Sequence, residues 1–249
     1  MQTSVNPKAF GRLTLIMLGS FGYAMYAPAL PNPDINALHL VVALVFVVTV
    51  GVLLMHALNR RQRLLDAVRV ELNKLRRLYH VSKNLSQLSG EFRPWFTELH
   101  GHIYKYMSRF AEKDFSAYDS FNRDFREISY HVYTIPAMSG AKEQALFADL
   151  LRTTSTVAEA RQLIKELWDN RLSFNVWVMI LLLTMSYIGA VTVAMPETMD
   201  GRLAGGFAVA AGCLAIDLLW KIDSLATEQS ALAKRYVDNV AKLELGRRE

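Results

Sequence analysis

The sequence is poor in cysteine and contains long stretches with no charged residue. Its 249 residues include one cysteine, Cys213, so a disulfide within the chain is impossible and a cysteine-based metal cluster is excluded. Lys, Arg, Asp and Glu are absent from residues 13–33, 35–59, 172–196 and 203–216. Three of these stretches exceed the roughly 18–20 apolar residues that span a bilayer. These absences exclude a soluble globular enzyme or a disordered chain as the leading interpretation and predict a protein embedded in a lipid bilayer.

The charge-free stretches predict four transmembrane helices. We expect these helices at Phe10 to Ala27, Ala37 to Leu58, Phe174 to Ala194 and Leu203 to Trp220. The second is the clearest. Its β-branched centre would suit a short buried strand, but the length of the apolar run favours a membrane helix. The first could also be a signal peptide. We favour a retained helix, because the apolar run is longer than a usual signal core and lacks a small-residue cleavage site.

The fold class predicted is all-α: a polytopic membrane protein with a long helical cytoplasmic insert between the second and third transmembrane helices. Residues 10–59 hold the first two spans, 60–171 the insert, 172–221 the last two spans and 222–249 a C-terminal amphipathic helix. The insert has 19 Lys and Arg against 14 Asp and Glu. Its apolar residues recur every three or four positions, which is typical of helices that bury one face.

The same periodicity predicts where the helices of the insert begin and end. We expect the helix of the second span to continue to about Leu88 and to be broken by Gly90 and Pro94. A third helix would be capped by Asp114 or Ser116. The last helix of the insert should run without a break into the third span, and the aromatic residues of all these stripes are expected in the core.

The distribution of positive charge predicts the orientation in the membrane. Basic residues lie before the first span, after the second, before the third and after the fourth. These are the span ends that adjoin the insert or a chain terminus. The short loops 28–36 and 195–202 instead hold three acidic residues and one arginine. By the positive-inside rule, both termini and the insert are expected to be cytoplasmic.

Motifs for catalysis or metal binding are missing. The sequence has no GxxxxGK[ST], GxGxxG, GxSxG or HExxH motif. His100 and His102 are two positions apart, so on a helix they point to different sides and are not expected to share a metal ion. We therefore expect no enzyme, no metal and no cofactor. The basic run from Arg60 to Arg63 lies directly after a predicted span, where anionic lipid headgroups explain it better than nucleic acid.

Asp217 is the ionisable residue predicted to lie within a span. Ionised carboxylates at bilayer depth are costly and usually face a protein interior or water. Lys221 lies four residues further along the same helix face. A local ion pair is therefore the favoured interpretation, and a functional intramembrane carboxylate is the alternative.

The order of two spans, a helical insert and two more spans resembles the bestrophin-like domain family of bacterial membrane proteins. The resemblance covers about residues 37–225. The similar segments are Glu71-Leu-Asn-Lys-Leu-Arg-Arg-Leu-Tyr79, Glu159-Ala-Arg161, Arg171 with Trp177, and Ile222-Asp223. The chain departs from the family where a Pro-Phe pair would follow Asp223, since Ser224 and Leu225 stand there instead.

The resemblance implies a function, because bestrophins are pentameric anion channels with a hydrophobic neck on the second membrane helix. It implies a homo-oligomer in a bacterial inner membrane that conducts small anions such as chloride. Val42, Phe46, Thr49 and Leu53 share a helix face and become the candidates for lining the pore. A lipid-facing or core stripe is the alternative for these four residues. No counterpart of the bestrophin Ca²⁺ clasp is found, so no metal is carried over.

A second function class stays open at this point. The chain could be a non-conducting membrane scaffold or signalling protein whose cytoplasmic helices bind a protein partner. A membrane enzyme ranks third, because no constellation of nucleophile, base or metal ligands is visible.

Overall fold

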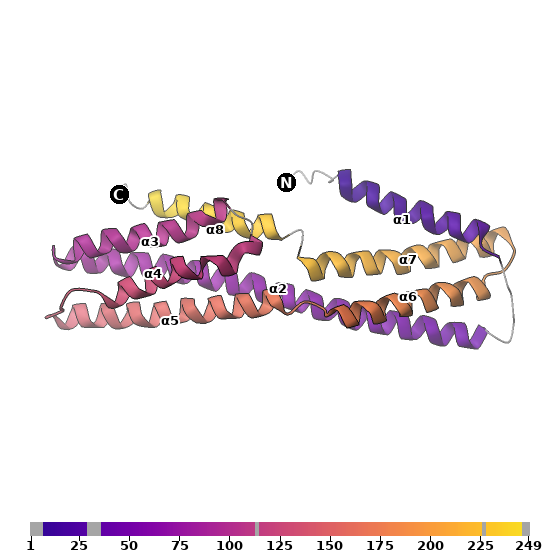
Figure 1. Cartoon of the computed structure of the whole chain (residues 1–249), viewed down its shortest axis with the longest axis horizontal. Coiled ribbons are helices and arrows are strands. Elements are labelled where there is room, and N and C mark those ends of the chain that lie inside the picture. The colour runs from indigo at the N-terminus through magenta and orange to yellow at the C-terminus, as the bar shows by residue number, and fades with distance from the viewer. Residues whose placement is uncertain (1–6, 29–35, 113–114, 226–227, 246–249) are drawn as a thin grey trace. The chain divides into compact units, whose positions relative to one another are not determined.

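The structure, a computed structural model, describes residues 7–28, 36–112, 115–225 and 228–245. Every regular element within these ranges is a helix, as the all-α fold class predicts. The elements in chain order are α1 (Pro7–Tyr26), α2 (Asn36–Leu88), α3 (Phe92–Glu112), the 3₁₀ helix η2 (Phe115–Phe121), α4 (Asn122–Tyr133), α5 (Ala141–Asp169), α6 (Phe174–Ala194), α7 (Met199–Ser224) and α8 (Gln229–Leu245) (Figure 1).

The chain divides into two compact units. Unit 1 comprises residues 1–59 and 172–224, and unit 2 comprises residues 60–171 and 225–249. Unit 1 therefore contains α1, the first part of α2, α6 and α7. Unit 2 contains the second part of α2 together with α3, η2, α4, α5 and α8.

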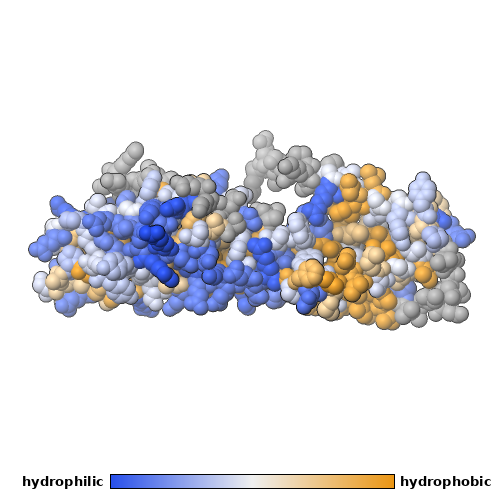
Figure 2. Space-filling view, in the orientation of Figure 1, coloured by the Kyte–Doolittle hydropathy of each residue, from blue (hydrophilic) through white to orange (hydrophobic). Residues whose placement is uncertain are grey.

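Three helical stretches are long and apolar enough to cross a membrane. Within the described residues they lie in His39–Leu88, Ala141–Ala194 and Met199–Val240, which contain the third and fourth predicted spans and the second from His39 onward. Helix α1 is not among these stretches, but it packs along α7 within unit 1 (Figure 1). On the face shown in Figure 2, apolar residues gather over unit 1, whereas the face of unit 2 is mostly hydrophilic.

Glycines on α7 allow aromatic side chains to approach its backbone closely. A Cβ atom at Gly206 would lie 2.8 Å from the ring of Phe21 on α1. A Cβ atom at Gly212 would lie 2.9 Å from the ring of Tyr187 on α6. Small residues at helix interfaces are how helices pack closely in lipid, where apolar burial gives little driving force. Helix α7 thus packs closely against both α1 and α6 in unit 1.

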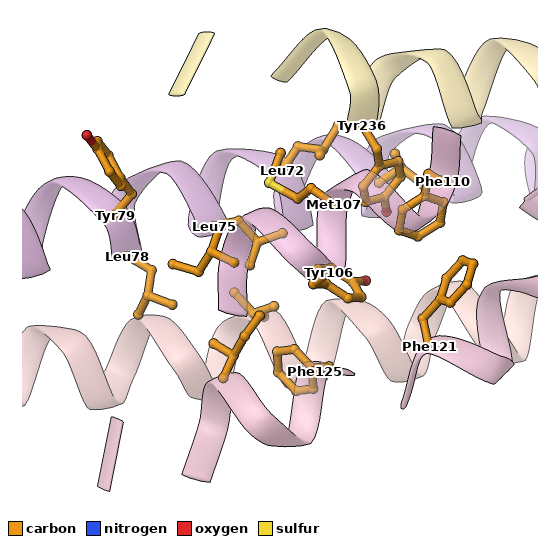
Figure 3. Close-up of a cluster of buried hydrophobic side chains, with 14 of the residues drawn as sticks. Leu72, Leu75, Leu78, Tyr79, Tyr106, Met107, Phe110, Phe121, Phe125 and Tyr236 are labelled. Atoms are coloured by element: carbon orange, nitrogen blue, oxygen red, sulfur yellow. The ribbon is translucent and has the colours of Figure 1, made fainter. Parts of the chain in front are cut away.

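Unit 2 has a core of aliphatic and aromatic side chains. Leu72 and Leu75 of α2 are buried against residues of α3, and Phe110 of α3 stacks on Tyr236 of α8 with ring centroids 3.9 Å apart (Figure 3). Each helix contributes one apolar stripe to this core, which is the pattern expected of amphipathic helices packed together. The insert helices therefore form a bundle with its own hydrophobic core.

The helix of the second predicted span continues as expected, but the helix before the third span does not. α2 is uninterrupted to Leu88. α5 ends at Asp169 and α6 begins only at Phe174, so the prediction of one continuous helix was wrong. The cause is local: Ser173 adopts an extended backbone and its hydroxyl accepts a hydrogen bond from Val176 N at 3.5 Å. This N-cap starts a new helix.

Two further helix ends differ from the expectations. The third helix of the insert begins as η2 and becomes α-helical only at Asn122; of its expected caps, Asp114 and the side chain of Ser116 lie outside the described residues. The C-terminal amphipathic helix was expected from Ile222, but α7 runs to Ser224 and α8 starts at Gln229. Leu225 between them has a φ of 53°, which breaks the helix, and burial of its side chain offsets the strain.

The continuity of α2 gives a first prediction. Val68 is fully buried in the middle of this helix. Val68→Pro should remove a helical hydrogen bond and clash with the preceding turn, lowering stability by about 3 kcal/mol or more. Thermal unfolding followed by circular dichroism measures the loss. Val68→Ala, which keeps the helix and loses only packing, is the control and should cost less; equal effects of the two changes would contradict a helix through this position.

Candidate functional site

The charge-free part of α2 exposes most of its large apolar side chains. Eight of them are exposed: Leu40, Val41, Leu44, Val45, Val47, Val48, Val52 and Met55. Soluble proteins rarely expose so much contiguous apolar surface, and such patches mark contacts with lipid or with another protein. This face of α2 is therefore suited to a bilayer or to a neighbouring subunit.

The four predicted pore residues do not share one environment. Phe46 is buried and stacks on Tyr187 of α6, with ring centroids 4.4 Å apart and planes within 9°. Val42, Thr49 and Leu53 are only partly buried. Phe46 thus packs inside unit 1, whereas Thr49 and Leu53 keep part of their surface free.

Thr49 and Leu53 line a groove between α2 and α6. The groove has a volume of about 600 Å³. Its other lining residues are Val45, Val176, Met179, Ile180, Leu182, Leu183 and Ser186. The lining is apolar except for the hydroxyls of Thr49 and Ser186, so the groove suits an apolar occupant.

Asp217 is held by two cations. Its side chain is buried in α7, and its Oδ2 lies 2.7 Å from Nζ of Lys221, the ion pair favoured from the sequence. The guanidinium of Arg12 from α1 pairs with Oδ1 and also lies over the ring of Trp220, 4.9 Å from its centroid. Spacing along the helix pointed to Lys221, but it could not point to Arg12, because that contact requires α1 to pack on α7. The carboxylate is neutralised within unit 1.

Asp223, one of the two family-motif residues, binds the backbone immediately before α6. Its side chain is buried, and Oδ1 accepts a hydrogen bond from the backbone N of Leu172 at 3.2 Å. Leu172 lies before the N-cap of α6, so its N–H has no partner within the helix, and the carboxylate satisfies this donor. Asp223 therefore ties the end of α7 to the residues that precede α6.

Among the described residues of unit 2, Glu71 is the most deeply buried charged residue. Its side chain is 0% exposed. Tyr118 and Tyr236 donate hydrogen bonds to Oε2 at 2.8 and 2.5 Å. Tyr106 donates to Oε1, and Nη1 of Arg161 lies 3.4 Å from the same oxygen. Four donors thus surround one carboxylate, which is what a buried charge needs in order to be tolerated.

Arg161, the other family-motif residue, supplies the positive charge of this cluster. Its second terminal nitrogen donates to Oδ1 of Asn122 at 2.9 Å. Its guanidinium carbon lies 4.9, 4.7 and 4.8 Å from the ring centroids of Tyr106, Tyr118 and Phe125. Cation–π contacts of this kind strengthen when the cation is removed from water. Arg161 is therefore held by its charge partner and by aromatic faces together.

The tyrosines of the cluster remain hydrogen-bond donors at neutral pH. Burial, followed by the negative charge of Glu71, raises the pKa of Tyr106, Tyr118 and Tyr236 well above the ordinary value. The protonated hydroxyls can then donate to the carboxylate at every physiological pH. The cluster joins α2, α3, η2, α5 and α8 through polar contacts. Glu71 and Arg161 belong to segments singled out in the sequence, whereas Tyr106 and Tyr118 were expected only as core residues and Tyr236 only as part of the C-terminal amphipathic helix.

The two histidines of the His-Gly-His segment have different neighbours. The ring of His100 lies beside Tyr79, with centroids 5.3 Å apart. Nδ1 of His102 lies 3.5 Å from Oε2 of Glu127 on α4. Within the described residues, no group of three or more His, Cys, Asp or Glu side chains is arranged to hold a metal ion.

Comparison with known proteins identifies a family. A family model described as "Bestrophin-like domain" matches residues 31–224, which is more than half of the chain. This region includes the charge-free part of α2, the Glu71 cluster except Tyr236, and both Asp217 and Asp223. No curated protein and no solved structure matches the chain.

The Glu71 cluster gives a second prediction. Arg161→Met should leave a buried carboxylate without its cation and lower stability by about 3–5 kcal/mol. Thermal or denaturant unfolding of the purified protein measures this loss. Adding Glu71→Gln to Arg161→Met should recover part of it, because the uncompensated charge is then gone.

Lys165→Met serves as the control for Arg161→Met. Lys165 lies one turn further along α5 and forms a solvent-exposed ion pair with Asp119 at 2.9 Å, so its removal should change stability little. A similar loss in both variants would contradict a special role for the buried pair.

Proposed function

Because this chain belongs to the bestrophin-like domain family, we propose that it is a homo-oligomeric membrane channel for small anions such as chloride. A pentamer is the assembly that the resemblance implies. The observation that carries the proposal is the exposed apolar face of α2, which lies in the matched region and has Thr49 and Leu53 beside it. A helix of this kind must contact lipid or other copies of itself, and a ring of such helices can enclose a pore.

The proposal includes a topology of four spans. α1 is not among the helices that are long and apolar enough to cross a membrane, but its packing along α7 supports its place beside them. We propose that residues 60–171 and both termini are cytoplasmic, in a bacterial inner membrane. The basic residues next to the span ends support this orientation.

The proposed neck lies on α2 at Val42, Phe46, Thr49 and Leu53. Apolar constrictions block ions by dewetting, since a narrow apolar passage offers an ion no replacement for its hydration shell. Thr49 and Leu53 are the sharper probes of this neck, because changing Phe46 would also remove its stack on Tyr187. The hydroxyl of Thr49 is the polar group of this stripe and would ease the passage of water.

The insert supplies the electrostatic preference for anions. Its 19 basic and 14 acidic residues give residues 60–171 a net charge of +5. A cytoplasmic vestibule with an excess of positive charge raises the local concentration of anions before they enter the neck. The same excess disfavours cations, so the proposal is for an anion channel rather than a nonselective one.

Currents through planar bilayers test the proposal. Purified protein should give chloride currents. Thr49→Leu should lower the conductance by making the neck more apolar, and Leu53→Ser should raise it by favouring wetting. Val237→Ser, at an exposed apolar position of α8, is the control and should leave the conductance unchanged. Silence of the wild-type protein and of Leu53→Ser under varied voltage, pH and Ca²⁺ would favour the scaffold instead.

The proposed orientation has its own test. A reporter enzyme that works only outside the inner membrane should be inactive when fused after Glu249, and a reporter that works only in the cytoplasm should be active there. Fusions within the loop 195–202 should give the opposite pattern. Activity of the external reporter at Glu249 would overturn the cytoplasmic placement of the C-terminus.

A further inference from the structure

Arg12, Trp220 and Lys221 gather around the buried carboxylate of Asp217 in unit 1, and we call these three side chains the α1–α7 basic site. Lys221 and Arg12 each form an ion pair with the carboxylate, and Arg12 also lies over the ring of Trp220. The side chain of Asp217 is 5% exposed, whereas those of Lys221 and Arg12 are 27% and 44% exposed. The acid therefore lies behind the two cations, and the cations are accessible from outside the helix pair.

The α1–α7 basic site carries an excess of positive charge. Counting its described side chains, two cations share one carboxylate, which leaves a net charge of +1. A guanidinium and an ammonium together also have more N–H donors than one carboxylate can accept. Arginine and lysine are the side chains with which proteins bind phosphate groups. The site is therefore suited to a second anion with several oxygen acceptors, and a phosphate group fits this description.

The position of the site along its helices is the edge of the apolar region. Arg12 directly precedes the charge-free residues 13–33, and Lys221 directly follows the fourth predicted span. Leu219, two residues before Lys221, is buried in one cluster with Ala57, which lies near the end of the second predicted span. Tryptophan and basic side chains favour this depth of a bilayer, because an apolar body can face the hydrocarbon while a polar tip reaches the headgroups. The anion that the site meets at this depth is a lipid phosphate.

Exposed apolar side chains continue from the site toward the middle of the bilayer. Leu15 lies three residues after Arg12 on α1, and Leu218 lies three residues before Lys221 on α7, so each leucine shares a helix face with its cation. Leu15 and Leu218 are 72% and 47% exposed, and Trp220 is 45% exposed. Acyl chains gain contact with such side chains, whereas a free phosphate ion gains nothing from them. The combination of cations and apolar surface therefore favours a lipid over a free anion.

We propose that the α1–α7 basic site binds the phosphate group of an anionic phospholipid. The phosphate oxygens accept hydrogen bonds from the outer sides of Arg12 and Lys221, and the acyl chains lie along Leu15 and Leu218. A zwitterionic lipid has the same phosphate, but the cation of its own headgroup competes with the two side chains, so the site prefers a lipid with a net negative charge. Basic pockets between transmembrane helices at the edge of a bilayer bind headgroups of this kind. The inference requires that the protein resides in a membrane and does not require that it conducts ions.

Fluorescence quenching of Trp220 by brominated lipids tests the proposal. The protein is reconstituted into phosphatidylcholine vesicles that contain a minor fraction of phosphatidylglycerol brominated in its acyl chains, or the same fraction of brominated phosphatidylcholine. The signal of Trp220 is the difference between the protein and its Trp220→Phe variant, which removes the contribution of the other tryptophans. Brominated phosphatidylglycerol should quench this signal several-fold more strongly, because the anionic lipid is enriched at the site. Equal quenching by the two lipids would overturn the proposal.

Variants separate lipid binding from the packing of α1 on α7. Arg12→Gln combined with Lys221→Gln should abolish the preference for phosphatidylglycerol. Asp217→Asn keeps both cations and raises the net charge, so it should keep or strengthen the preference even if it lowers stability. Arg202→Gln is the matched control, because Arg202 of α7 donates to the backbone oxygen of Met25 on α1 at 2.7 Å, at the opposite end of the helix pair. Its loss weakens the same packing and should leave the lipid preference unchanged.

Inorganic phosphate distinguishes a lipid from a free anion as the occupant. Added to the vesicles at an ionic strength matched with sodium chloride, it should leave the quenching by brominated phosphatidylglycerol unchanged. Relief of quenching by phosphate but not by chloride would mean a site for free phosphate and would overturn the lipid assignment. A loss of preference in Arg202→Gln as large as in the double glutamine variant would also overturn it, since the preference would then follow packing. These measurements contain no ion current, so the channel can fail its own test while the lipid site stands.

Discussion

The fold of unit 2 depends on the buried carboxylate of Glu71. A charge with no exposure to water is tolerable only if its partners are complete, and here three tyrosine hydroxyls and one guanidinium supply them. Those partners come from α3, η2, α8 and α5. If any of these helices were packed elsewhere, a charged group would be left unpaired in the interior. The cluster therefore selects one arrangement of the bundle where apolar stripes alone would accept several.

Unit 1 is under a different constraint, because its surface is apolar. The exposed side chains of α2 and α6 cannot lie against water without a large free-energy cost, so the surroundings of this unit must be lipid or protein. Its helices accordingly meet through close contacts, with Gly206 and Gly212 giving space to aromatic rings. The family match and these surfaces support the same conclusion, that the protein resides in a membrane.

Local patterns in the sequence predicted where the helices lie better than they predicted the contacts between helices. The apolar stripe after residue 60 was enough to extend α2 to Leu88, since periodicity is a property of one segment. The same reasoning missed the break before α6, because a stripe does not register the N-cap that Ser173 provides. It also could not assign the tyrosines of the Glu71 cluster: Tyr106 and Tyr236 are 35 and 165 residues from their acceptor. Only the packed fold joins them.

The buried acids Asp217 in unit 1 and Glu71 in unit 2 illustrate the same principle. In unit 1, Asp217 takes one cation from its own helix and a second, Arg12, from α1. In unit 2, Glu71 takes its cation from α5, 90 residues further along the chain. A buried acid contributes little net stability, because desolvation cancels most of the attraction. Each acid instead destabilises every arrangement of the helices in which its distant partner is absent. Apolar stripes in unit 2 and close packing in unit 1 thus bring the helices together, and the two acids select which helices meet.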